Sequence, residues 1–117
     1  MRLVDPETSE EWILGRAILR ALIQELREDQ VRPVLLIMPS EAWVLRRKPD
    51  SLHRSIMRFS KREGVDVIDL LPAFTAKVAE SKIDDYFIPM DRHWTDKGHE
   101  LASQEIHKFL TAKHYVR

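Results

Sequence analysis

Apolar residues near the amino terminus recur at the spacing of one helix face. The residues that define this face are Trp12, Leu19, Leu22, Ile23 and Leu26. Thr8 or Ser9 can cap the helix, and Glu11 lies three residues after Thr8, as in a capping box. The pattern predicts a helix over about residues 9–28.

Two short apolar runs farther along the chain have the character of strands. Residues 34–38 are all apolar, most have branched side chains, and a proline flanks them on each side. This pattern predicts a strand that is buried on both faces. Residues 65–70 predict a second strand. A helix over about residues 51–63 is expected between them, capped by the turn at Asp50 and ended by Gly64. Its expected apolar side comprises Leu52, Ile56, Met57 and Phe59.

The remaining third of the chain predicts two more helices and a loop. Residues 72–79 favour a short helix with Phe74 and Val78 facing inward, and residues 82–90 favour a loop. Thr95 or Asp96 caps a last helix over about residues 96–113. Strands that alternate with helices indicate an α/β fold with a parallel sheet and helices on both faces.

Two strands are few for such a fold. A strand as apolar as residues 34–38 is typical of the middle of a sheet, and an isolated two-stranded sheet is only marginally stable in water. We therefore expect residues 1–117 to form a single, partial domain. We also expect a second copy of the chain or a partner chain to cover the open sheet edge.

Composition excludes several classes of function. Lys and Arg total 19, as do Asp and Glu, so the chain has no net charge to attract nucleic acid or anionic membranes. Cysteine and asparagine are absent, and the three glycines do not form a phosphate-binding loop or a Gly-x-Ser-x-Gly elbow. No cofactor is expected. Residues 1–7 lack the apolar core of a signal peptide and no stretch is long enough to span a membrane, so a cytoplasmic location is expected for the sequence as written.

The segment with the clearest chemistry is residues 87–99. Asp91 precedes His93 by two residues, in a loop that follows the last strand and comes just before a helix. A carboxylate at this spacing can orient an imidazole and stabilise its protonated form, as in the base half of a catalytic triad. In open α/β sheets such chemistry gathers at the carboxyl ends of the strands.

This segment resembles the carboxyl-terminal block of SGNH (GDSL-type) hydrolases, in which Asp-x-His supplies the acid and base partners of a serine. The pattern Asp91-x-His93-Trp94, with Gly98-His99 downstream, is similar to the branch of carbohydrate O-acetyl esterases and acetyltransferases. Residues 34–40 and 64–70 resemble the last two core strands of that family, and the resemblance extends over residues 12–110. It implies a three-layer, flavodoxin-like fold whose amino-terminal strands are missing.

The chain departs from the family in its nucleophile and oxyanion donors. SGNH enzymes carry the serine in a Gly-Asp-Ser block and use a glycine and an asparagine from two further blocks, none of which occurs here. The resemblance therefore implies that His93 is the general base, Asp91 orients it, and Trp94 shapes a pocket for a small-molecule or carbohydrate ester. The serine and the oxyanion donors would come from sequence outside this chain, which alone would be inactive. The alternative is a noncatalytic, truncated module that oligomerises through its sheet edge.

Several other residues have two interpretations each. Ser40 can face His93 or cap the turn after its strand, and Trp43 can line a substrate rim or pack over the sheet end. Asp91, His93 and His99 offer metal-ligand atoms without a recognised spacing, so no metal site is predicted. Asp66 and Asp69 lie in the last strand, where Asp69 is expected to cap local backbone. Solvent exposure is expected for His53, His107 and His114, and for the basic run at residues 46–48.

Overall fold

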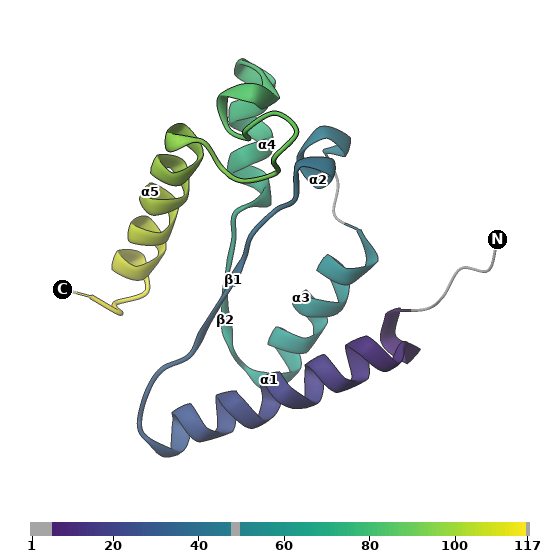
Figure 1. Cartoon of the computed structure of the whole chain (residues 1–117). Coiled ribbons are helices and arrows are strands. Elements are labelled where there is room, and N and C mark those ends of the chain that lie inside the picture. Colours follow the sequence, from purple (N-terminus) through teal and green to yellow (C-terminus); the bar gives the residue numbers. More distant parts are fainter. Residues whose placement is uncertain (1–5, 48–49, 117) are drawn as a thin grey trace. The chain divides into compact units, whose positions relative to one another are not determined.

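The computed structural model describes residues 6–47 and 50–116 (Figure 1). Lys48 of the basic run and residues 1–5, which bear on the expected absence of a signal peptide, lie outside the described residues. The elements are η1 (Pro6–Thr8), α1 (Glu10–Glu28), β1 (Val34–Ile37), α2 (Glu41–Arg46), α3 (Ser51–Glu63), β2 (Asp66–Asp69), α4 (Leu71–Glu80), η2 (Ile83–Asp85) and α5 (Asp96–Ala112). Strands and helices alternate as the sequence predicts.

Strands β1 and β2 pair in a two-stranded parallel sheet flanked by helices, which confirms the α/β class. The contacts divide the chain into two compact units. Of the described residues, the first unit comprises 6–35 and 50–67, and the second comprises 36–47 and 68–116. In the part of the chain that is described, none of the helices combines the length and apolar character needed to cross a bilayer.

The first unit packs α1 and α3 around an aromatic pair. The rings of Trp12 and Phe59 meet edge to face with centroids 6.2 Å apart, and Ile23 and Val65 complete the buried cluster. Ser9 caps α1, since its side chain accepts a hydrogen bond from the backbone N–H of Trp12. Ser9 rather than Thr8 is therefore the cap, and the predicted capping box with Glu11 is wrong.

The second unit has its own aromatic core around Phe74 of α4. Phe74 is fully buried and its ring contacts those of Tyr86, Phe87 and Trp94. Leu101 and Ala102 of α5 are also buried. This core lies directly beneath the loop that carries Asp91 and His93, as described below.

The inward face of α3 differs from the prediction. Phe59 is buried as expected, but Leu52 and Met57 are 44% and 38% exposed. His53, expected in solvent, is only 7% exposed, whereas His107 and His114 are exposed. His53 and the buried Ser60, seven residues later, lie on the same face of the helix. Ile56 packs against the buried cluster, so the predicted apolar side is confirmed for Ile56 and Phe59 and wrong for Leu52 and Met57.

Two further expectations for the strands and loops need correction. Leu36 of β1 is 40% exposed, so the expectation of a strand buried on both faces is wrong within the described residues. The short helix α2 was not predicted from the sequence pattern. Arg46 is the last residue of α2 and Arg47 its cap, both exposed as expected for part of the basic run.

Candidate active site

The Asp91–His93 loop is a short antiparallel turn with its own backbone hydrogen bonds. Phe87 and Trp94 form an isolated antiparallel bridge, and the N–H of Ile88 donates to the carbonyl oxygen of His93 at 2.8 Å. The N–H of Asp91 donates back to the carbonyl oxygen of Ile88 at 3.1 Å. These bonds fix the backbone on either side of His93.

Two residues of the turn adopt left-handed backbone conformations. Met90 has a φ of 67° and Arg92 a φ of 71°, values that non-glycine residues rarely adopt. Each such residue costs about 1–3 kcal/mol and persists only where the surroundings hold it. The strained residues lie on both sides of Asp91, and the chain reversal that they make brings Asp91 and His93 together.

The side chains of Asp91 and His93 are in direct contact through Oδ1 and Nδ1. The hydrogen bond with His93 lowers the pKa of Asp91, and the hydrogen bond and negative charge of Asp91 raise the pKa of His93. The His93 side chain is 84% exposed. Because Nδ1 is engaged by Asp91, the other ring nitrogen, Nε2, is the atom that can exchange a proton with a substrate or nucleophile.

Trp94 anchors the loop to the core of the second unit. Its ring stacks on Phe74 with centroids 5.2 Å apart and meets the ring of His99 edge to face at 5.4 Å. Trp94 is half-buried and His99 is exposed. The tryptophan therefore ties the residue next to His93 to a rigid support, and its predicted role in shaping a substrate pocket stays a prediction.

Thr95 and Gly98 join the loop to α5. Thr95 caps the helix by accepting a hydrogen bond from the N–H of Gly98 at 3.2 Å, and its hydroxyl donates to the carbonyl oxygen of Asp85. A Cβ on Gly98 would lie 2.6 Å from the carbonyl oxygen of Tyr86 and 2.9 Å from Cβ of Trp94. Only glycine therefore permits α5 to begin this close to the loop.

A cavity of about 450 Å³ in the second unit includes the loop residue Arg92 in its lining. The other lining residues are Ser40, Glu41, Ala42 and Leu45, at the start of α2. Ser40 caps α2, since its Oγ accepts a hydrogen bond from the N–H of Trp43 at 3.1 Å. The capping interpretation of Ser40 is thus confirmed, and the serine also borders a cavity shared with the Asp91–His93 loop.

The remaining candidate residues lie outside the Asp91–His93 loop. Trp43 is half-buried in α2 and does not line that cavity. Asp69 accepts a hydrogen bond from the N–H of Leu71 at 3.0 Å, which confirms its predicted role as a local cap. Asp66 is half-buried at the start of β2. Among the described residues, no three His, Cys, Asp or Glu side chains gather as metal ligands.

Comparison with known families places this geometry in context. A family model described as an SGNH hydrolase-like domain of acetyltransferase AlgX matches residues 16–117. The chain belongs to this family. The SGNH resemblance based on Asp91-x-His93-Trp94, and its O-acetyltransferase branch, are thereby confirmed. No curated protein and no solved structure matches the chain.

This SGNH domain has positioning residues that the sequence reading did not assign. Phe74 supports Trp94, the carbonyl oxygen of Tyr86 accepts a hydrogen bond from the N–H of Thr95 at 3.0 Å, and Arg92 borders the cavity. Gly98 was noted only as part of the motif. Two signals in the sequence point to a helix that begins against the loop. Gly98 lies only four residues after Trp94, and the cap residue Thr95 lies between them.

Proposed function

We propose that Asp91 and His93 are the acid and base partners of a serine nucleophile in SGNH-type acyl transfer, with an acetyl ester of a carbohydrate as the substrate class. The observation that supports this role most directly is the contact of Asp91 Oδ1 with His93 Nδ1 on a strained, exposed loop. Membership of a family named for an acetyltransferase supports the acetyl group.

The chemistry follows from the exposed ring nitrogen. His93 Nε2 accepts the proton of the serine hydroxyl while the serine oxygen attacks the ester carbonyl, and Asp91 stabilises the imidazolium that forms. The tetrahedral intermediate expels the alcohol, which takes the proton from Nε2, and an acyl-serine forms. In the second half, His93 removes a proton from water or from a sugar hydroxyl, and the oxygen of that group attacks the acyl-serine. The second tetrahedral intermediate expels the serine oxygen, which takes the proton back from Nε2, so that the free serine and His93 are restored. Water gives hydrolysis and the sugar hydroxyl gives acetyl transfer.

The proposal places the serine and the oxyanion donors in sequence outside these 117 residues. Ser40 lines a cavity together with Arg92 of the loop, and its oxygen already accepts the α2 capping bond. The sequence lacks asparagine, which SGNH enzymes use as a side-chain oxyanion donor. Loss of one oxyanion donor alone costs about 100- to 1000-fold in rate, so the chain by itself should be inactive.

The test compares two proteins on p-nitrophenyl acetate and on an acetylated oligosaccharide. The first is the 117-residue chain, and the second is the extended protein, translated together with the flanking coding sequence. We expect background rates from the first and turnover from the second that His93→Ala abolishes, whereas His107→Ala, an exposed control on α5, has no effect. Turnover by the short chain that is lost in both His93→Ala and Ser40→Ala would make Ser40 the nucleophile and contradict the proposal.

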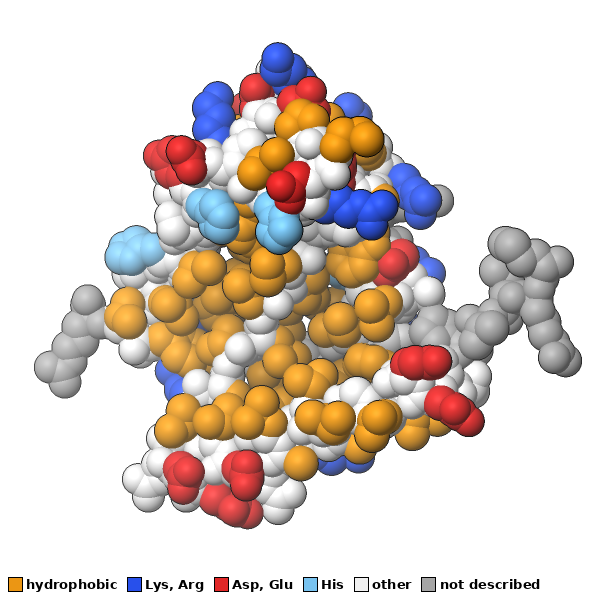
Figure 2. Space-filling view, viewed as in Figure 1, with side chains coloured by type: hydrophobic (Ala, Val, Ile, Leu, Met, Phe, Trp, Pro, Cys, Tyr) orange, Lys and Arg blue, Asp and Glu red, His pale blue; other side chains and the backbone are white. Residues whose placement is uncertain are grey.

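A second candidate is a noncatalytic module that associates through apolar surface. The observation in its favour is a row of hydrophobic side chains along α1 (Figure 2). Ile13, Leu14, Ile18 and Leu22 are each 46–63% exposed. This candidate predicts stable association by an extended protein that has no esterase activity, an outcome that the same preparation reveals by sedimentation.

A further inference from the structure

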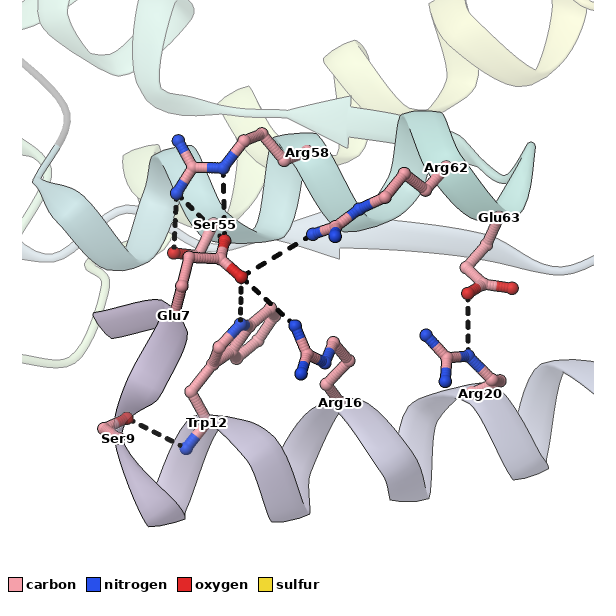
Figure 3. Close-up of polar contacts among 9 residues, drawn as sticks. All are labelled: Glu7, Ser9, Trp12, Arg16, Arg20, Ser55, Arg58, Arg62 and Glu63. Carbon is pink, nitrogen blue, oxygen red and sulfur yellow. Dashed lines mark hydrogen bonds and ion pairs between the residues drawn. The ribbon is translucent and has the colours of Figure 1, made fainter. Parts of the chain in front are cut away.

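A carboxylate held by several arginines lies in the first unit, which does not contain Asp91 or His93. Glu7 of η1 lies against α1 and α3 (Figure 3). Its Oε1 accepts hydrogen bonds from Nε and Nη2 of Arg58, at 3.1 and 2.9 Å. Arg58 also donates to the hydroxyl of the buried Ser55 at 3.3 Å. Two donors of one guanidinium thus converge on one carboxylate oxygen.

The second oxygen of Glu7 has three further partners (Figure 3). Oε2 accepts hydrogen bonds from Trp12 Nε1 at 3.3 Å and from Arg16 Nη1 at 3.2 Å, and it lies 3.6 Å from Nη2 of Arg62. The hydrogen bond from Arg58 is the largest cause that lowers the pKa of Glu7. The carboxylate is therefore bound by donors from two helices, in the manner of a bound anion.

Positive charge exceeds negative charge around this carboxylate. A hollow of about 530 Å³ is lined by Glu7, Arg58, Lys61 and Arg62, so three cations face one acidic group among the described residues of its lining. The only acidic residue of α3, Glu63, pairs with Arg20 at 2.8 Å. Arg58 and Arg62 are 53% and 56% exposed. Their guanidiniums have donors left for a second acceptor.

The groups that donate hydrogen bonds to Glu7 are carried by helices α1 and α3, which pack against each other. Trp12, which donates to Glu7, is 7% exposed and packs edge to face on Phe59 of α3. Arg58, Lys61 and Arg62 occupy positions i, i+3 and i+4 of α3, which are neighbours on one face of a helix, and all three line the hollow. A fixed group of guanidinium and ammonium donors is the arrangement that binds carboxylates and phosphates.

We propose that this hollow is a binding site for a small dianionic oxyanion, a phosphate or a dicarboxylate, which Arg58, Lys61 and Arg62 hold beside Glu7. Glu7 keeps the Arg58 and Arg62 side chains in place, and its charge weakens the binding of a second anion. Glu7 sets the affinity through these opposed effects. The site is independent of acyl transfer and belongs to the first unit alone.

The experiment titrates the 117-residue protein with inorganic phosphate and, in a second arm, with malonate, at constant ionic strength. The readout is the indole N–H signal of Trp12 in ¹⁵N–¹H NMR spectra, because this group donates to Glu7. Trp43 and Trp94 belong to the second unit and provide internal controls. A saturable shift confined to Trp12 supports the site. Tighter binding of phosphate assigns a phosphoryl ligand, and tighter binding of malonate assigns a dicarboxylate.

Three variants separate binding from fold stabilisation. Lys61→Gln removes a lining charge with no ion pair to Glu7 among the described contacts, and it should weaken binding of a dianion about thirtyfold, as expected for one positive charge about 4 Å from two negative charges in water. Glu7→Gln keeps an acceptor for Arg58 but removes the opposing charge, so the affinity for a dianion should rise about thirtyfold. Arg46→Gln, an exposed arginine on α2, should change nothing.

The result that overturns the proposal is the absence of a saturable Trp12 shift with both anions, or equal weakening by Lys61→Gln and Arg46→Gln. If Glu7 serves only to hold η1 in place, neither anion will give a saturable Trp12 shift. Glu7→Gln will then lower the melting temperature without any effect on anion binding. Lys61→Gln keeps the test decisive even if Glu7→Gln fails to fold.

Discussion

Replacing Gly98 by alanine should destabilise the protein, although alanine is the better helix former. The new Cβ would lie 2.6 Å from the carbonyl oxygen of Tyr86, a backbone atom that cannot rotate away. Overpacking of this kind costs about 1–3 kcal/mol. Displacement of Tyr86 also weakens its hydrogen bond with the N–H of Thr95, worth about 1 kcal/mol. The higher helix propensity of alanine offsets about 1 kcal/mol of this cost. The free energy of unfolding should therefore fall by about 2 kcal/mol.

Gly15 provides the matched control. It lies in the middle of α1, and a Cβ there would meet nothing within 4 Å. Gly15→Ala should therefore raise the free energy of unfolding by about 1 kcal/mol through helix preference alone. The two variants should differ by about 3 kcal/mol with opposite signs relative to wild type.

The assay is urea unfolding followed by far-ultraviolet circular dichroism, with near-ultraviolet spectra to report on Trp94. Gly98→Ala should also perturb the Trp94 environment, because the new methyl group contacts Cβ of that residue at 2.9 Å. A Gly98→Ala protein as stable as Gly15→Ala, with an unchanged near-ultraviolet spectrum, would refute the close approach of α5 to the loop.

Three further predictions concern charge, caps and association. The raised pKa of His93 adds stability that is complete below about pH 6.5 and is lost as the pH rises through the folded pKa, while the lowered pKa of Asp91 adds stability that is lost as the pH falls below about 4. Asp91→Asn should remove both effects and lower the pKa of His93. NMR titration of His93, with His107 as the control, measures this change. An unchanged His93 titration would contradict the contact between the two side chains. Ser40→Ala should cost about 1 kcal/mol and Ser40→Gly a few tenths, because Ser40 caps α2; equal losses in urea unfolding would argue against the cap. The open edge and apolar α1 surface predict a dimer or larger assembly at micromolar concentration that Ile18→Lys weakens, and sedimentation of a folded monomer, with slow amide exchange over residues 34–38, would count against it.

Local signals in the sequence predicted most of the fold. Ser9, Asp50 and Thr95 cap the three long helices where capping residues precede apolar periodicity, and Gly64 ends α3 with a φ of 66°. Helix α2 was missed because only six residues separate its cap from the next loop, too few for a periodic pattern. The burial of His53 depends on which neighbours α3 meets, which hydrophobicity along one helix does not encode.

The functional residues, like the fold, were predicted where the signal is local in the sequence and missed where it depends on tertiary packing. Asp91 and His93 were found because two residues separated by one position carry a recognisable chemical relation. The Glu7 site was not found, because its partners Arg16 and Arg58 lie 9 and 51 residues away along the chain. Long-range pairing of this kind depends on the packing of α1 against α3. The roles of Met90 and Arg92 were hidden as well, since their positive φ values are properties of the folded turn.

The most direct test of the central claim is a double-mutant cycle at Asp91 and His93 in the extended protein. The measured quantity is kcat/KM for acetyl ester turnover as a function of pH. If Asp91 acts through His93, Asp91→Asn should lower turnover on the order of 10³- to 10⁴-fold, His93→Ala at least as much, and the double variant no further than His93→Ala. The wild-type rate should rise with pH as His93 loses its proton. Additive losses, or full activity in either single variant, would contradict the assignment of this pair as the catalytic base and its partner.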